Sequence, residues 1–211
     1  MAAVWGRLLG SALLGLSGPL AEAGGPEDGL ELRLREVHNI SHYTGVRQQA
    51  VELRLPGRDR LIAGERRFAL DWVASVGELA WDEGRARTVS IGRGIRWRPL
   101  RALPRSELHL SLSPTWVEHT ALAGRELGGH LHFTTAAAWV LPLDRAGQRT
   151  LALRLQHTSN AGTQADNPGL DLAGIELGWR FGARLPAWFE RPPATLTLGL
   201  RPVAMAAADP G

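Results

Sequence analysis

Beyond residue 28 the chain alternates apolar and polar residues in about eight segments of roughly ten residues each. In one of them, Leu153 and Leu155 flank Arg154 and are followed by Gln156. Because successive side chains of a β-strand point to opposite faces, this period of two predicts strands with one apolar and one polar face. The predicted strands cover residues 29–37, 46–55, 66–77, 87–98, 106–117, 129–141, 149–159 and 171–181.

Turn-forming residues separate the predicted strands, among them Pro56-Gly57 and Asn167-Pro168-Gly169. Strands joined by turns in sequence order fold most simply into a barrel, since closure leaves no edge strand unpaired. The sequence therefore predicts an all-β protein, an eight-stranded antiparallel up-and-down transmembrane β-barrel. A soluble, lipocalin-like barrel with its apolar rows inside is the alternative fold.

The polar face of the strands favours the transmembrane barrel. It combines both signs of charge with Gly, Ser, Ala and Thr, which suits a narrow lumen filled by ion pairs. Trp179 and Phe181, near the end of the last predicted strand, fall on the apolar face, where a membrane barrel carries its aromatic girdle. The predicted lumen charges are Glu31, Arg33, Arg35, Glu52, Arg54, Asp71, Arg154, Glu176 and Arg180.

The N-terminus resembles a secretory signal peptide. One charge, Arg7, precedes a short apolar run over residues 8–20, and Ala21 and Ala23 stand where a signal peptidase reads small residues. A buried first helix is the alternative, although glycines and a proline in the run would weaken it. We expect the chain to divide into a signal peptide over 1–23, an outer-membrane barrel over 24–181, and a C-terminal extension of unknown structure over 182–211.

Composition excludes several classes of function. The chain has no Cys, so disulfides, thiolate metal sites and Cys nucleophiles are absent. All 24 basic residues are Arg and 21 residues are acidic, with no block of like charge, so we expect no nucleic-acid partner. No motif implies a cofactor, and we expect no metal site.

Three chemically active residues fall on the predicted apolar face of the last two strands. His157 and Ser159 continue the row of Leu151, Leu153 and Leu155, and Asp171 begins the apolar row of the following strand. With both termini in the periplasm, the seventh strand runs outward, so this group faces lipid near the outer leaflet. One interpretation is that Ser159 and Asp171 simply begin a solvated loop. The other is a nucleophilic Ser, activated by His157 and oriented through it by Asp171.

At these residues the sequence resembles the PagL-type lipid A 3-O-deacylases of Gram-negative outer membranes. The segment HTSNAG, residues 157–162, followed by NPGLD, residues 167–171, is similar to that family's His-x-Ser-Asn-Ala-Gly pattern and the acid on its next strand. The resemblance implies a bacterial outer-membrane enzyme that hydrolyses the ester-linked acyl chain at position 3 of lipid A, without a cofactor. Its catalytic residues would be His157, Ser159 and Asp171.

The resemblance also implies further site residues and partners. Asn160 and Gly162 correspond to the family's oxyanion residues, and Phe133 to an aromatic near its acyl groove. The family's acid is commonly Glu, so the reach of the shorter Asp171 to His157 depends on strand geometry. The expected partners are the lipid A of lipopolysaccharide and outer-membrane lipids, and a homodimer is left open. A non-enzymatic outer-membrane barrel with a structural or adhesive role is the alternative function.

Overall fold

The computed structural model describes residues 29–41, 45–63, 66–97, 105–164, 167–182 and 195–198. Eight long strands form the barrel in these residues: β1 (Leu30–Asn39), β2 (Arg47–Ala63), β3 (Arg66–Trp81), β4 (Gly84–Trp97), β5 (Glu107–Val117), β8 (Leu131–Pro142), β9 (Arg149–Ser159) and β10 (Leu170–Phe181). Three short strands accompany them: β6 (Ala121–Leu122), β7 (Arg125–Glu126) and β11 (Thr195–Leu198). Among the residues described here, no helix is long and apolar enough to span a membrane.

Closure of the barrel comes from β1, which pairs antiparallel with both β2 and β10. Leu32 lies opposite Leu53 on one side and opposite Trp179 on the other. Every other neighbouring pair of long strands is also antiparallel and consecutive along the chain, apart from the β6–β7 hairpin inserted between β5 and β8. The predicted eight-stranded antiparallel up-and-down barrel is therefore confirmed.

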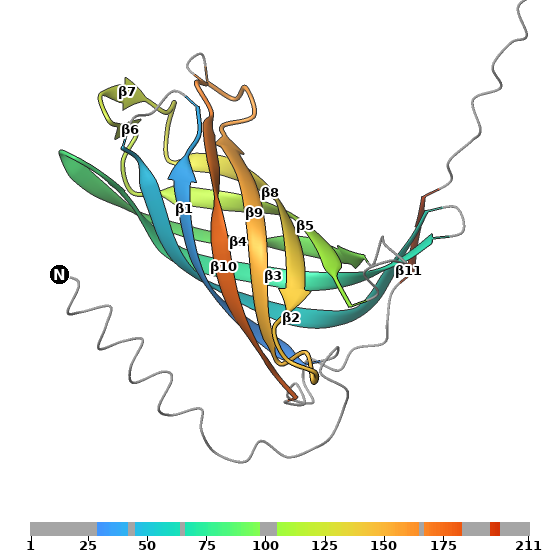
Figure 1. Cartoon of the computed structure of the whole chain (residues 1–211). Coiled ribbons are helices and arrows are strands. Elements are labelled where there is room, and N and C mark those ends of the chain that lie inside the picture. Colours follow the sequence, from blue (N-terminus) through green and yellow to red (C-terminus); the bar gives the residue numbers. More distant parts are fainter. Residues whose placement is uncertain are drawn as a thin grey trace, which may run out of the picture.

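The two ends of the barrel are distinct (Figure 1). The terminal end holds the pair formed by Leu30 and Phe181, where the barrel strands begin and finish. The hairpin end, opposite to it, carries β6 and β7. The loop between β9 and β10 also lies at the hairpin end.

Strand alternation places charges inside the barrel and leucines outside. Along β9, Leu153 and Leu155 are 61% and 59% exposed, whereas Arg154 between them is 4% exposed. Because only one face of each strand borders the narrow lumen, a period of two in the sequence becomes a polar interior and an apolar exterior. The nine predicted lumen charges are all buried.

Ion pairs fill the lumen toward the terminal end. Arg33 donates to Glu31 and to Glu176, both at 2.9 Å, and is fully buried. Arg154 donates to Glu176 at 2.8 Å and to Glu52 at 3.2 Å. A buried charge is tolerated only with such partners, so this network fixes the spacing of strands around the lumen.

Apolar side chains close the lumen at the hairpin end. The β6–β7 hairpin contributes Leu122, which is 1% exposed, and Leu127 follows it at 7%. They pack into a buried cluster with strand residues from around the barrel. The other members of this cluster are Val37, Val46, Leu79, Ala86, Val117, Leu170 and Leu172.

The turn predicted at Pro56-Gly57 is wrong, because both residues lie within β2. The pairing of β2 with β3 shifts register between Pro56 and Arg60, and continues to Ala63. Proline has no N–H for the ladder, and here the pairing is interrupted after Pro56 without ending the strand. The expected signal peptide lies outside the described residues.

One strand occurs in the predicted C-terminal extension. β11 pairs in parallel with the last residues of β2, from Arg60 to Ala63 (Figure 1). It joins the sheet beyond the register shift of β2 and takes no part in the β1–β2 and β1–β10 pairings that close the barrel.

Candidate active site

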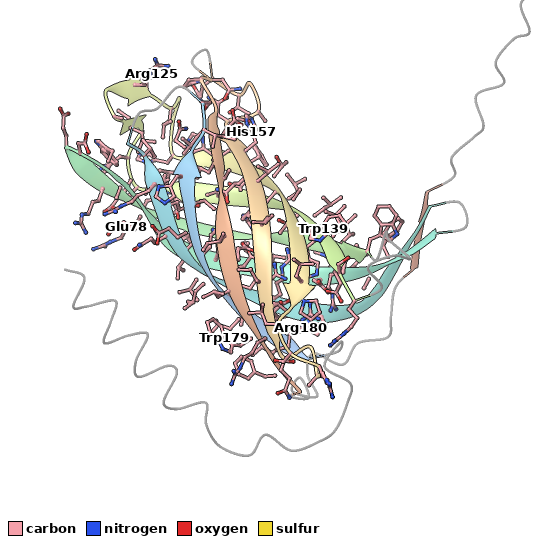
Figure 2. The ribbon with its side chains drawn as sticks, viewed as in Figure 1. Glu78, Arg125, Trp139, His157, Trp179 and Arg180 are labelled. Atoms are coloured by element: carbon pink, nitrogen blue, oxygen red, sulfur yellow. The ribbon has the colours of Figure 1, made fainter. Side chains whose placement is uncertain are left out.

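His157 and Asp171 lie opposite each other on the neighbouring strands β9 and β10. The His157 Nδ1 and the Asp171 Oδ1 are 2.7 Å apart, a hydrogen bond that the shorter Asp side chain reaches in full. The two side chains are 49% and 45% exposed, and both point out of the barrel. Figure 2 shows His157 near the hairpin end, with Trp179 and Arg180 at the terminal end.

The hydrogen bond to Asp171 sets the tautomer of His157. A carboxylate can only accept, so Nδ1 carries the proton and the neutral ring has its lone pair on Nε2. Within the described residues Nε2 makes no hydrogen bond. The basic nitrogen is therefore open toward the outer surface of the barrel.

Ser159 follows His157 by two residues and shares its outward face. Residues two apart on a strand are separated by about 6.6 Å along the chain. No side-chain hydrogen bond joins Ser159 to His157 among the described residues, which is common for such pairs before substrate binds. On its other side Ser159 lies opposite Phe133 of β8, so the structure places this predicted aromatic on the neighbouring strand beside Ser159.

Asn160 anchors the loop that follows Ser159. Its side chain is fully buried, donates from Nδ2 to the Leu127 carbonyl at 3.2 Å, and accepts from the Gly162 N–H at 2.9 Å. The Asn160 N–H donates to the Asn167 Oδ1 at 3.0 Å. These bonds tie the β9–β10 loop to itself and to the segment after the β6–β7 hairpin.

Both groups predicted as oxyanion donors thus have partners inside the protein. The Asn160 Nδ2 is held by Leu127, and the Gly162 N–H is held by Asn160. Gly162 is exposed and has φ of +75°, in the left-handed region that glycine adopts readily.

Sequence reasoning missed two residues that lie beside His157. Thr135 of β8 is opposite His157 on the side away from Asp171, and its side chain is exposed. Gly169, just before β10, packs against the imidazole ring. Gly169 belongs to the predicted turn, but its contact depends on how the loop folds back, which a sequence pattern does not show.

Comparison with protein families identifies one family, and a solved structure shares the fold. The sequence model of the lipid A 3-O-deacylase (PagL) family matches residues 51–180. The crystal structure of the outer membrane enzyme PagL superposes with a TM-score of 0.54 and 13% identity, covering 72% of this chain and 99% of that chain. No curated protein sequence matches the chain significantly.

Proposed function

The chain belongs to the PagL family of lipid A 3-O-deacylases, and we propose that His157, Ser159 and Asp171 form its catalytic triad. The protein is a hydrolase of carboxylic esters located in the bacterial outer membrane. Lipid A is its proposed substrate, cleaved at the ester that holds the acyl chain at position 3.

The observation that carries the proposed triad is the outward His157–Asp171 pair. Ionisable side chains on the lipid face of a barrel are costly in the bilayer, and least so near its edge. Here the pair lies at the end of a strand and has an open ring nitrogen and a hydroxyl two residues away. A purely solvated loop start would not need the 2.7 Å hydrogen bond that fixes the ring.

The proposed reaction has two steps, acylation of Ser159 and hydrolysis of the acyl-enzyme. Ser159 Oγ attacks the ester carbonyl while its proton passes to His157 Nε2, and Asp171 stabilises the imidazolium. The tetrahedral intermediate collapses, the sugar hydroxyl leaves with the proton from Nε2, and an acyl-enzyme remains. Water then attacks the acyl-enzyme with His157 as base, which releases the fatty acid and restores Ser159.

We further propose that Asn160 and Gly162 stabilise the oxyanion and that Phe133 contacts the acyl chain. The family resemblance supports the first pair, and the position of Phe133 opposite Ser159 supports the second role. The Gly162 N–H is bonded to the Asn160 Oδ1, so this donor reaches the oxyanion only if that bond opens as the intermediate forms.

Purified protein in detergent, mixed with lipopolysaccharide, tests the proposal. We expect release of a 3-hydroxy fatty acid and lipid A lighter by one acyl chain, with no metal added. Ser159→Ala should be nearly inactive while it still gives the heat-dependent gel shift of a folded barrel. Thr158→Ala is the matched control, because it removes a neighbouring hydroxyl that faces the lumen and bonds Thr134. Full activity in Ser159→Ala would end the assignment of the nucleophile.

A further inference from the structure

Gly169 lies directly against the ring of His157. A Cβ atom placed on Gly169 would stand 2.9 Å from the His157 Cε1, 3.7 Å from Nε2 and 3.8 Å from Nδ1. The first distance is shorter than a carbon–carbon contact allows. The ring therefore occupies the space that any other residue at position 169 would fill with its side chain.

The segment that carries Gly169 is held by a buried side chain and by hydrogen bonds to its backbone. Leu170 is 3% exposed within the apolar cluster at the hairpin end. The Asp171 carbonyl accepts from the Ile40 N–H at 3.0 Å and from the Asn39 Nδ2 at 3.1 Å. Gly169 and Asp171 thus reach His157 from one anchored piece of backbone, one by packing and the other by a hydrogen bond.

We propose that Gly169 is a positioning residue for the deacylation reaction. Its missing side chain lets the imidazole lie against the backbone with Nδ1 on Asp171, and this placement directs Nε2 along the outer surface toward Ser159. The proposal rests on the triad proposed above. It adds a residue, Gly169, that controls the position of the His157 ring by its lack of a side chain and takes no part in the chemistry itself.

A side chain at position 169 should displace the ring more readily than the backbone. The ring is half-exposed and turns about its own side-chain torsions, whereas the neighbouring backbone is held by Leu170, Asn39 and Ile40. Gly169→Ala should therefore leave the barrel folded and shift the imidazole ring of His157. A misplacement near 1 Å at a reacting group can cost about 100-fold in rate.

The experiment compares Gly169→Ala with Gly147→Ala. Gly169 has φ of +67° and Gly147 has φ of +69°, so alanine meets the same backbone strain at both positions. A Cβ at Gly147 meets nothing within 4 Å, so only the variant at 169 also contacts a side chain. We expect Gly169→Ala to lower kcat on lipopolysaccharide by roughly 10- to 100-fold with KM within about twofold. Gly147→Ala should stay within about twofold of the wild type in both.

A second readout follows Ser159 without lipid A. A fluorophosphonate probe labels an activated serine: Oγ bonds to phosphorus, fluoride leaves, and the hydroxyl proton passes to His157 Nε2. The labelling rate of Gly169→Ala should fall in parallel with kcat. ¹⁵N NMR of labelled histidine should also show a changed Nδ1–H signal for His157, which a general loosening of the loop at Gly147 would not produce.

Two outcomes would overturn the role of Gly169: activity of Gly169→Ala equal to that of Gly147→Ala, or an unchanged labelling rate. If Gly169→Ala does not fold, Gly169→Asn and Gly147→Asn replace the pair, since Asn adopts positive φ with less strain and still introduces a Cβ. Failure of the triad is distinguishable, because Ser159→Ala would then retain both labelling and deacylation.

Discussion

Two His–carboxylate pairs of nearly equal length lie in different environments of this barrel. His157 and Asp171 are 2.7 Å apart on the outer face, and about half of each side chain is exposed. His109 and Glu107 are 2.8 Å apart in the lumen, where their side chains are 0% and 6% exposed. The two hydrogen bonds have similar lengths, but His157 bonds its carboxylate through Nδ1 and His109 through Nε2. A difference in role then depends on what surrounds the other ring nitrogen.

The surroundings differ in what meets the second ring nitrogen. Arg33 lies 2.8 Å from the His109 Nδ1 and can only donate, so that nitrogen accepts and Nε2–H donates to Glu107. Arg180 also donates to Glu107. Both nitrogens of His109 are thus used inside the protein, whereas His157 keeps its basic nitrogen open. An imidazole–carboxylate pair therefore does not by itself indicate a general base, and the role proposed for His157 depends on the open lone pair of its Nε2.

Removal of each histidine should separate the two roles most strongly. His157→Ala should lower deacylation by about 10³-fold or more, because triad members act as a unit, and should leave the unfolding temperature unchanged. His109→Ala should do the reverse, with activity within a few fold and an earlier heat-dependent gel shift, since Arg33 and Glu107 each lose a buried partner. An equal loss of activity in both variants would contradict the separate roles expected for His157 and His109.

Removal of the lumen carboxylate should show what that pair contributes to stability. Glu107→Ala leaves the buried His109 and Arg180 without this partner, and breaking such a buried pair costs about 3–5 kcal/mol. Urea unfolding in detergent or lipid measures the change. Deacylation by the folded fraction should stay near the wild-type rate, and a large loss of activity per folded molecule would contradict the structural role.

Removal of the outer carboxylate should have the smaller effect on stability and a clear effect on turnover. Asp171→Ala should lower kcat by about 100-fold or more, because His157 loses the group that fixes its tautomer. Asp171→Glu should retain or raise activity, since a carboxylate remains and matches the residue common in the family. Kinetics on lipopolysaccharide check both variants, and an inactive Asp171→Glu would show that strand spacing demands the shorter acid.

A third carboxylate, Asp144, has backbone N–H partners and no histidine, and its removal should have the smallest effect on stability. Asp144, in the turn between β8 and β9, accepts from the Gln148 N–H at 2.9 Å and the Arg149 N–H at 2.8 Å. Desolvation raises the pKa of Asp144, but the backbone donors of Gln148, Arg149 and Gly147 outweigh it and hold that pKa below its usual value.

The depressed pKa fixes the sign of the pH effect. The stabilisation by Asp144 is fully present above the unfolded pKa, near 3.9, and is lost as pH falls through the lower folded pKa. Asp144→Asn should therefore unfold slightly earlier than the wild type at pH 7, and the difference should vanish in strong acid. Unfolding midpoints of both proteins at pH 7 and in strong acid measure this difference. A difference that grows on acidification would contradict the role of Asp144.

The sequence predicted the parts of the fold that depend on a local period of two. Alternation put Arg154 and His157 on opposite faces of their strand, because successive side chains point to opposite sides. The mixed charges of the polar face and the aromatics at Trp179 and Phe181 then predicted which face lines the lumen. It failed at Pro56, where a residue that usually ends a strand is absorbed by a register shift within β2. The length of that strand depends on pairing with β3, which is not a local property.

The details of the site depended on long-range contacts that no pattern encodes. The motif named Asn160, but its burial and its bond to the Leu127 carbonyl depend on where the β6–β7 hairpin folds. Gly169 was predicted as part of a turn, yet its contact with the His157 ring follows from the way the loop returns to β10. Backbone partners such as the Leu127 carbonyl leave no side-chain signature in a sequence.

The outward direction of His157 and Asp171 determines how a lipid reaches them. Their neighbours on the same face, Leu155 and Ile175, are 59% and 51% exposed. A lipid anchored in the leaflet therefore arrives by sliding sideways in two dimensions, with its chains still in the bilayer. Turnover then follows the mole fraction of substrate at the surface, so added detergent should slow the reaction by surface dilution even at constant bulk concentration.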